Sequence, residues 1–227
     1  MSQSAFLKIG RIFRKIISPE KEKDLFLNQA TGVIHIGANS GQERKLYARH
    51  DLDVLWIEPN PKVFKELQKN IGNLKKQKAF QYLISDDDKD EVDFHISSND
   101  GQSSSLLELG DHKSIWPEVQ YISTITLESC TFKTFIEREE IDYLSYNTLV
   151  LDTQGAELMV LRGAGELVKN FTFIKTEAAD FDSYIGCCKI DDLSSHLKKF
   201  NFNEVGRWKF ANSENKNYFD ILFKRTI

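Results

Sequence analysis

Apolar runs and amphipathic stretches alternate along the chain from residue 32 onward, and this alternation restricts the fold more than any other feature. Clusters of apolar and β-branched residues predict buried strands at 32–36, 53–58, 78–84, 147–152 and 171–177. Two further runs, 92–96 and 119–127, are strand-like. Helical patterns occupy 42–50, 60–71, 130–139, 155–170 and 190–200. This order predicts an α/β fold, a mostly parallel sheet with helices on both faces.

The last two predicted strands, 204–212 and 218–225, have no helix between them. Only the short polar segment SENKN joins them, whereas parallel neighbours need a long crossover. We therefore expect them to pair antiparallel. Such an ending differs from that of a dinucleotide dehydrogenase, which would keep adding strand–helix units.

The composition fits one main domain and narrows its partners. The 227 residues are 41% hydrophobic with a formal net charge of −4, which gives no reason to expect nucleic-acid binding. Three cysteines make no disulfide framework, so a cytoplasmic location is expected. The five histidines show no metal-ligand spacing, and no metal is expected. No apolar run approaches the roughly 20 residues that span a bilayer, and no signal-peptide pattern is present.

The first seventeen residues form a pattern of their own. Apolar residues fall on one side of a helical wheel, whereas Lys8, Arg11, Arg14 and Lys15 fall on the other. A basic amphipathic helix of this kind suits peripheral contact with an anionic membrane, here the inner membrane surface. The alternative is a helix packed on the domain. Residues 1–29 are thus predicted to be a helical appendage, and 30–227 the main domain.

Polar residues follow the predicted strands at the places where these strands end. In an open α/β sheet, ligands bind beyond the carboxyl ends of the strands. The expected ligand-facing groups are Gly37 to Gly41, then Glu58, Pro59 and Asn60, then Ser85 and Asp86, then Asp152, Thr153 and Gln154, and finally Glu177.

The types and spacing of these residues indicate an adenosine-bearing cofactor. Glycines let the backbone approach a ligand, and Glu58 lies 21 residues after Gly37, at the distance usual for an acid that binds ribose hydroxyls. Asp86 could accept a hydrogen bond from the adenine amine. A dinucleotide turn would need glycines where Asn39 and Gln42 stand, so S-adenosylmethionine, which has no phosphate, fits better than NAD. Taken singly, each residue could equally be a turn or a helix cap.

Three longer motifs resemble the FkbM-type family of S-adenosylmethionine-dependent methyltransferases. They are VIHIGANSGQE, VLWIEPNP and LVLDTQGAELMVLRGAG, the last followed by FIKTE. The resemblance covers about residues 30 to 225. It implies a Rossmann-like, class I methyltransferase fold with seven strands, the last antiparallel. It also implies O-methylation of sugars, polyketide hydroxyls or similar small or glycan acceptors.

The resemblance assigns roles to individual residues. Gly37, Ala38, Asn39 and Gly41 would hold the amino-acid end of the cofactor, and Glu58 the ribose. Ser85 and Asp86 would lie beside the adenine, and 152–157 would line the floor near the methyl group. The sequence departs from the family at His35, Val150 and Gln154, where Asp, Lys and Glu are frequent. His35 could still contact the cofactor or be a satisfied buried histidine, and the identity of the catalytic base is put in doubt.

Candidate bases are Asp152, Glu177 and His112, because a hydroxyl acceptor must lose its proton. The interval from Asp86 to Asp152 is longer than one helix and short loops need. An insertion at about 97–127 is therefore predicted as a substrate lid, with an ordinary surface insertion as the alternative. Acceptor contacts are expected from Ser103, Ser104, Trp116 and Glu157. Two other functions stay open, namely a degenerate methyltransferase-fold binding module and a nicotinamide-dependent oxidoreductase.

Overall fold

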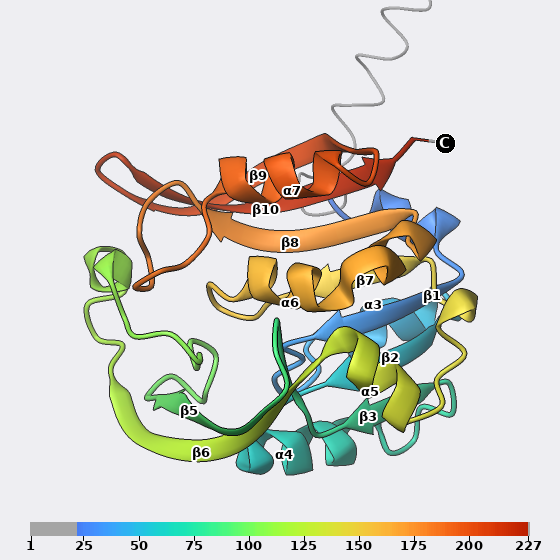
Figure 1. Ribbon diagram of the computed structural model, residues 1–227, viewed down its shortest axis with the longest axis horizontal. Helices are drawn as coiled ribbons and strands as arrows, with labels where there is room; N and C mark the ends of the chain where they lie inside the picture. The colour runs from blue at the N-terminus through green and yellow to red at the C-terminus, as the bar shows by residue number, and fades with distance from the viewer. Residues whose placement is uncertain (1–21, 227) are drawn as a thin grey trace, which may run out of the picture.

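Seven strands form the central sheet of the computed structural model, which describes residues 22–226 (Figure 1). The strand order is β3-β2-β1-β7-β8-β10-β9. The bounds are β1 (Gly32–Ile36), β2 (Asp53–Ile57), β3 (Gln77–Phe80), β7 (Thr148–Leu151), β8 (Phe173–Ala179), β9 (Phe202–Ser213) and β10 (Lys216–Arg225).

Strand β1 can lie at the centre of the sheet because its residues are apolar except for His35, whose ring nitrogen Nδ1 lies within hydrogen-bond distance of the Tyr47 hydroxyl. It pairs in parallel with β2 on one side and β7 on the other, and all five residues are buried. Strands buried on both faces are typical of parallel sheets covered by helices. The carboxyl ends of β1, β2 and β7 consequently meet at one edge.

The predicted antiparallel hairpin at the end of the chain is confirmed. β10 pairs antiparallel with both β8 and β9. The seven-stranded, class I methyltransferase fold expected from the resemblance is thereby confirmed as well.

Within residues 22–226, five helices cover the two faces of the sheet, as predicted. One face carries α3 (Arg44–Arg49) and α4 (Pro61–Ile71), and the other carries α5 (Phe132–Arg138), α6 (Glu157–Ala164) and α7 (Ile190–Lys198). Helix α4 shows how the sequence sets these elements. Asn60 caps it by accepting from the backbone N–H of Lys62 over 3.0 Å, and Val63, Leu67 and Ile71 form its buried stripe.

Two predicted elements are divided in the structure. The helix predicted over 155–170 ends at Ala164, because Gly165 adopts a φ of +53°, and a 3₁₀ helix, η4 (Gly165–Asn170), follows. The single strand predicted over 78–84 is also wrong. Only β3, up to Phe80, belongs to the central sheet, and Leu83–Ser85 forms β4 in a second sheet.

The second sheet is built from the long interval between β3 and β7. It contains β4 (Leu83–Ser85), β6 (Tyr121–Thr131) and β5 (Lys89–Ser97) in that order, with β6 parallel to β4 and antiparallel to β5. The ordered insertion therefore extends beyond the predicted 97–127. The 98–118 segment, called the lid loop below, forms most of the connection from β5 to β6 and contains a short 3₁₀ helix, η2 (Asp111–Ser114).

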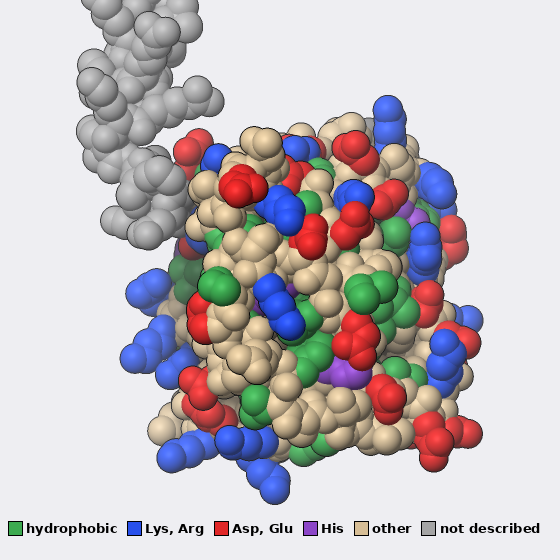
Figure 2. Space-filling view, turned by 90° about the vertical axis from the view of Figure 1, so that its left-hand side faces the viewer, with side chains coloured by type: hydrophobic (Ala, Val, Ile, Leu, Met, Phe, Trp, Pro, Cys, Tyr) green, Lys and Arg blue, Asp and Glu red, His purple; other side chains and the backbone are tan. Residues whose placement is uncertain are grey.

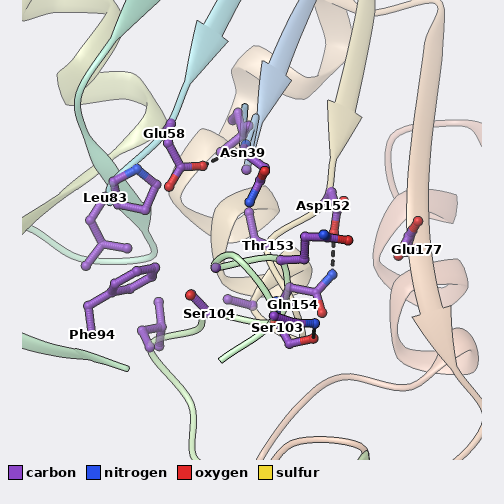
Figure 3. Close-up of a pocket in the computed structure, with 18 of the residues that line it drawn as sticks. Asn39, Glu58, Leu83, Phe94, Ser103, Ser104, Asp152, Thr153, Gln154 and Glu177 are labelled. Atoms are coloured by element: carbon purple, nitrogen blue, oxygen red, sulfur yellow. Dashed lines mark hydrogen bonds between the residues drawn. The ribbon is translucent and has the colours of Figure 1, made fainter. Parts of the chain in front are cut away.

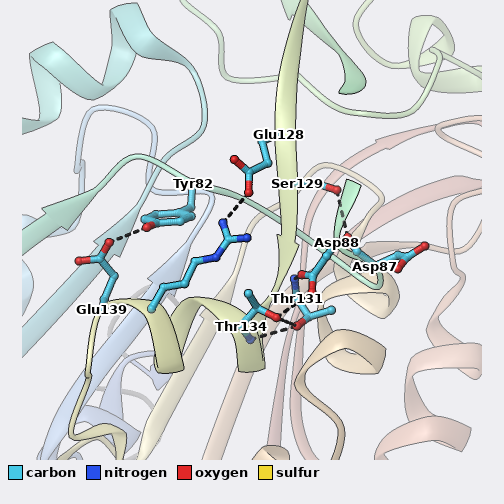
Figure 4. A network of polar contacts seen from close by, with 9 residues as sticks. Tyr82, Asp87, Asp88, Glu128, Ser129, Thr131, Thr134 and Glu139 are labelled. Atoms are coloured by element: carbon cyan, nitrogen blue, oxygen red, sulfur yellow. Dashed lines mark hydrogen bonds and ion pairs between the residues drawn. The ribbon is translucent and has the colours of Figure 1, made fainter. Parts of the chain in front are cut away.

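A polar network ties the second sheet to the start of α5 (Figure 4). Asp88, in the turn before β5, accepts from the backbone N–H of Thr131 over 2.7 Å and from the Thr134 hydroxyl over 2.9 Å. Thr131 itself caps α5 through a hydrogen bond from the Thr134 backbone N–H. These bonds lower the pKa of Asp88. The insertion is thus fixed at its base.

The described residues before β1 are part of the domain rather than a separate appendage. Residues Leu25–Gln29 form a 3₁₀ helix, η1, and Phe26 and Leu27 are buried in the core beside α3 and α4. The predicted basic helix at 1–17 lies outside the described residues. Within 22–226, no helix is long and apolar enough to cross a membrane.

Candidate active site

A cavity of about 270 Å³ lies at the edge where β1, β2 and β7 end, with the lid loop on its other side (Figure 3). The central sheet contributes the turn after β1, the end of β2, the end of β7 and a residue of β8. The second sheet and the lid loop supply the opposite wall. Segments far apart in the sequence therefore meet around one space.

The turn after β1 brings backbone to the cavity without side-chain bulk. Gly37 adopts a φ of +83°, and a Cβ at this position would lie 1.8 Å from the carbonyl oxygen of Asp152. Asn39 also has a positive φ, +43°, which asparagine tolerates better than most residues. Its side-chain oxygen accepts from the backbone N–H of Ser40 over 2.7 Å. The turn is thus held in one shape by its own residues.

Glu58 closes this turn from the end of β2. Its carboxylate accepts the backbone N–H of Asn39 over 2.8 Å and that of Asn60 over 2.9 Å. Burial raises the pKa of Glu58 to about 7, whereas the two backbone hydrogen bonds act in the opposite direction. Glu58 also lines the cavity, and a carboxylate has more acceptor positions than these two hydrogen bonds use.

Two further acids, Asp152 after β7 and Glu177 on β8, lie on neighbouring strands (Figure 3). The side-chain amide of Gln154 donates to Asp152 over 2.5 Å. Burial raises the pKa of both acids, and the charge of Asp152 raises that of Glu177 further. A pair of buried acids favours either a shared proton or a cation beside them.

Aromatic side chains enclose the end of the cavity nearest Glu177. Trp116 of the lid loop packs 5.0 Å from the Tyr218 ring and 4.9 Å from the His112 ring, measured between centroids. Within residues 22–226, His112 Nδ1 and the Tyr218 hydroxyl are buried without a hydrogen-bond partner. Burial lowers the pKa of His112 to about 4, so this imidazole is neutral at pH 7. The arrangement offers an aromatic, largely apolar platform at this end of the cavity.

Comparison with known proteins decides the family. The model of the FkbM methyltransferase domain matches residues 35–207. The chain belongs to this family. The resemblance seen in the sequence is confirmed, and membership supports S-adenosylmethionine as the cofactor. The 2-O-methyltransferase NoeI of Sinorhizobium fredii is 27% identical over 198 residues, which cover 84% of this chain and 78% of that protein.

Solved methyltransferase structures are similar at lower identity. A TehB-like S-adenosylmethionine-dependent methyltransferase from Corynebacterium glutamicum has a TM-score of 0.44 and 8% identity, over 98% of this chain and 97% of that chain. An rRNA methylase from Streptococcus thermophilus has a TM-score of 0.49 and 8% identity, over 93% and 99%. A magnesium protoporphyrin IX methyltransferase from Synechocystis PCC 6803 has a TM-score of 0.47 and 10% identity, over 86% and 69%.

Many of the residues predicted for this FkbM site do line the cavity. From the central sheet these are Gly37, Asn39, Glu58, Pro59, Asp152, Thr153, Gln154 and Glu177, and from the lid loop Ser103, Ser104, His112 and Trp116. The structure therefore brings together residues as far apart in sequence as 37 and 177.

Other predicted cofactor residues lie behind the cavity. The His35 ring stacks on Trp56 at 5.0 Å, and its Nδ1 lies 3.2 Å from the Tyr47 hydroxyl. Its side chain points to the face of the sheet opposite to that of Ile36, which does line the cavity. Burial lowers the pKa of His35 to about 4. This histidine is thus a satisfied core residue.

The remaining residues of the turn and the next loop support its shape. Ala38 is buried in the core on the α3 side, and Gly41 lies against Leu67 of α4, which a Cβ there would meet at 2.7 Å. Asn60 uses its side chain to cap α4. None of the three lines the cavity.

Ser85 and Asp86 were predicted to lie beside the adenine of the cofactor, but neither residue lines the cavity. The chain leaves the central sheet at Phe80, so the residues after β3 that reach the cavity are Tyr82, Leu83 and Ile84, and Phe94 of β5 joins them. Tyr82 is oriented by a 2.5 Å hydrogen bond from its hydroxyl to Glu139 (Figure 4). The polar Gln81-Tyr82 pair inside the apolar run 78–84 is the signal that could have located this exit.

Glu157 was expected to contact the acceptor, but its carboxylate is used inside the protein. It accepts the backbone N–H groups of Thr153 over 3.0 Å and of Gly155 over 3.1 Å, and it does not line the main cavity. Gln154 and Gly155 both have positive φ. Glu157 therefore holds the loop after β7 in this conformation.

The serines of the lid loop also bond mainly within the protein. The Ser104 hydroxyl accepts the backbone N–H of Ser97 over 3.0 Å, and the Ser103 hydroxyl accepts from the Asn99 amide over 3.0 Å. The Ser105 hydroxyl donates to the carbonyl oxygen of Gln154 over 2.8 Å. These bonds join the lid loop to β5 and to the loop after β7.

Two residues of the terminal hairpin also line the cavity, Phe210 and Tyr218. Sequence reasoning missed both, because their strands were interpreted only as the closing pair of the sheet. Aromatic residues near the turn of that hairpin are the signal that could have found them.

Proposed function

We propose that this protein transfers the methyl group of S-adenosylmethionine to a hydroxyl of an uncharged sugar, or of a similar small hydroxylated metabolite. The observation that carries the proposal is the single cavity in which the Gly37–Glu58 turn, the Asp152 and Glu177 acids and the aromatic end meet. Family membership and the 2-O-methyltransferase relative support the same reaction type.

The cofactor fits the residues around the turn. Gly37 leaves room for a close approach, and the Glu58 carboxylate has acceptor positions free for ribose hydroxyls. Tyr82, Leu83 and Phe94 provide apolar surface for a flat base. S-Adenosylmethionine, when bound, supplies an activated methyl group on a positively charged sulfonium.

The acids Asp152 and Glu177 suit that charge. A positive group beside two buried carboxylates stabilises their ionised forms. One of the two can then take the proton that the acceptor hydroxyl loses during attack. The lid loop and the aromatic end keep water away and hold the hydroxyl in line with the methyl group.

The charge of the lining favours an uncharged acceptor. Among the described residues no lysine or arginine lines the cavity, whereas three carboxylates do, those of Glu58, Asp152 and Glu177. A phosphate or carboxylate on the acceptor would meet these acids without a basic partner. The aromatic end instead offers ring faces, which suit the apolar face of a sugar ring.

The same reasoning disfavours nucleic acid as the acceptor. Figure 2 shows the side of the molecule at the left of Figure 1, where the second sheet and the terminal hairpin end. Acidic and basic side chains are mixed there, and the described part of this face carries no continuous basic area. Nucleic-acid sites normally need such an area.

Binding of the cofactor is tested by calorimetry. We expect S-adenosylmethionine and its demethylated product to bind the purified protein, NAD not to bind, and Glu58→Ala to weaken both interactions. Glu66→Gln, an exposed acid on α4, is the matched control. Binding of NAD alone would support the oxidoreductase alternative and overturn the proposal.

Transfer is tested with a panel of acceptors and isotopically labelled cofactor. The panel contains neutral sugars, the matching sugar phosphates and uronic acids, and RNA. We expect labelled methyl groups on neutral sugars. Cofactor binding without transfer to any acceptor would favour the degenerate binding module, and labelling of RNA or of the anionic sugars alone would contradict the proposed acceptor class.

A further inference from the structure

The acids of the cavity are backed by a second set of charges on the same face of the sheet. Asp220 of β10 stands directly opposite Glu177 of β8 in the antiparallel register, so the two carboxylates project from one face. Asp220 is buried, with 5% of its surface exposed. Its charge therefore acts on Glu177 with little screening by water.

Asp220 is held by two lysines from different parts of the chain. Lys23 Nζ lies 2.7 Å from Oδ2 of Asp220, and Lys175 Nζ lies 3.8 Å from Oδ1. Lys175 is shared with Asp24, at 3.6 Å. Among the salt bridges of residues 22–226, Lys23 thus pairs with Asp220 alone, whereas Lys175 pairs with both Asp220 and Asp24.

The position of Lys23 is set by the core and not by the ion pair alone. The residues that follow it, Phe26 and Leu27, are buried beside α3 and α4, and Phe26 packs 5.7 Å from the Phe173 ring of β8. This anchor brings Lys23 to a residue 197 positions away in sequence. The buried residues Phe26 and Leu27 therefore fix the place of Lys23 beside Asp220.

We propose that Lys23 is a positioning residue of the active site, which offsets the negative charge of Asp220 and so favours the ionised form of the neighbouring Glu177 carboxylate. The inference rests on the proposed function only in giving Glu177 a role in methyl transfer. The arrangement of charges around Glu177 does not depend on that function. A residue of the segment before β1 would thus influence the protonation of an active-site acid through Asp220.

The charged and titratable groups around Glu177 make the direction of the effect clear. Asp152, Asp220, Glu157 and Tyr218 face it from β7, β10 and α6, and the cations are Lys175 and Lys23. Burial and then the neighbouring acids raise the pKa of Glu177, and Lys175 lowers it. Loss of Lys23 leaves one lysine for Asp24, Asp220 and Glu177 together. Glu177 then keeps its proton to a higher pH.

The test is a carbon-13 NMR titration of the full-length protein labelled in its glutamate and aspartate carboxyl groups, with Glu177→Gln to assign the signal. In Lys23→Met we expect the apparent midpoint of Glu177 to rise by roughly one pH unit, and in Lys23→Arg to stay near the wild-type value. Asp220→Asn should lower it, which gives a second variant of opposite sign. Lys76→Met, which breaks the exposed Lys76–Asp51 pair, should leave it unchanged.

Two outcomes would overturn the inference. One is a Glu177 midpoint that is the same in Lys23→Met and the wild type, and the other is an equal rise in Lys76→Met. A purely structural role for Lys23 would lower stability without moving the midpoint. If the midpoint moves as expected but the wild type transfers no methyl group to any acceptor, the charge coupling stands and the proposed function fails. If methyl transfer occurs, the acidic limb of its pH–rate profile should move to higher pH in Lys23→Met by the same amount as the Glu177 midpoint.

Discussion

The backbone N–H of Asn39 donates to Oε2 of Glu58 over 2.8 Å and so joins the turn after β1 to the end of β2. The carboxylate that is proposed to bind the ribose therefore also holds the turn that is proposed to bind the amino-acid end of the cofactor. Two parts of one ligand would be recognised by a single, connected unit.

Replacing Glu58 should consequently weaken cofactor binding more than the loss of one ligand contact would. We expect Glu58→Gln to raise the Kd for S-adenosylmethionine about 10-fold and Glu58→Ala about 100-fold, because the amide keeps an acceptor for Asn39 and alanine keeps none. Calorimetry measures both values. Equal affinities for the two variants and the wild type would show that Glu58 does not contact the cofactor.

Gly37 should be needed for folding as well as for binding. A Cβ there would lie 1.8 Å from the carbonyl oxygen of Asp152, in a backbone with a φ of +83°, so the ends of β1 and β7 must separate. We expect Gly37→Ala to lower the free energy of unfolding by about 3 kcal/mol. Gly165 also has a positive φ, but a Cβ at that position would meet nothing within 4 Å, so Gly165→Ala meets backbone strain alone and should cost less than Gly37→Ala.

Urea unfolding of the two variants measures this difference. The larger loss in Gly37→Ala would identify the clash with Asp152 as the main term, since the φ strain is common to both glycines. Equal losses would show that the turn can move away from β7, and that the close approach is not required for the fold.

Local residue patterns predict the parts of the site that lie directly at strand ends. The Gly37 turn and Glu58 follow β1 and β2 without interruption, so their positions depend only on where those strands end. Asp152 follows β7 in the same way, whereas Glu177 lies within β8, two residues before the strand ends at Ala179. The terminal hairpin is predictable because the five residues between its two predicted strands are too few for a crossover.

Positions that depend on tertiary packing are not predictable in this way. Ser85 and Asp86 are expected at the cavity only if the run 78–84 is one strand, but the chain leaves the central sheet after Phe80. His35 lies on the wrong face because periodicity alone does not say which face of β1 meets the ligand. The role of Glu157 could not be predicted, because the backbone N–H groups that it accepts belong to a loop in which Gln154 and Gly155 have positive φ.

Stability should fall as pH rises, because burial raises the pKa of Asp152 from its ordinary value near 4 to about 7. The folded state then keeps this proton at pH values where the unfolded chain has lost it. The contribution is complete below about pH 4 and is lost as pH rises toward about 7, with a slope of up to about 1.4 kcal/mol per pH unit.

Asp152→Asn removes the titrating group and should flatten this part of the profile. Urea unfolding at a series of pH values from about 4 to about 8 measures the slope for each protein. Asp93→Asn, which changes an exposed acid on β5, is the control and should keep the wild-type slope. A slope in Asp152→Asn as steep as in the wild type would show that other groups carry the pH dependence.

Trp116 should affect the acceptor and not the cofactor. Its ring packs against Tyr218 and His112 at the end of the cavity away from Glu58, where it offers a flat apolar face to a sugar ring. We expect Trp116→Ala to raise the KM for a neutral sugar acceptor about 10-fold, a loss of about 1.4 kcal/mol, with the Kd for S-adenosylmethionine unchanged. Trp116→Phe should lie between the two proteins.

Steady-state kinetics with varied acceptor, together with calorimetry of the cofactor, separate these effects. Lys113→Ala, an exposed change in the same segment η2, should leave both constants unchanged. If Trp116→Ala instead weakened cofactor binding as strongly as acceptor binding, the residue would serve the shape of the whole lid loop. A KM equal to that of the wild type would place the acceptor elsewhere in the cavity, since a ring stacked on Trp116 cannot lose this face without losing affinity.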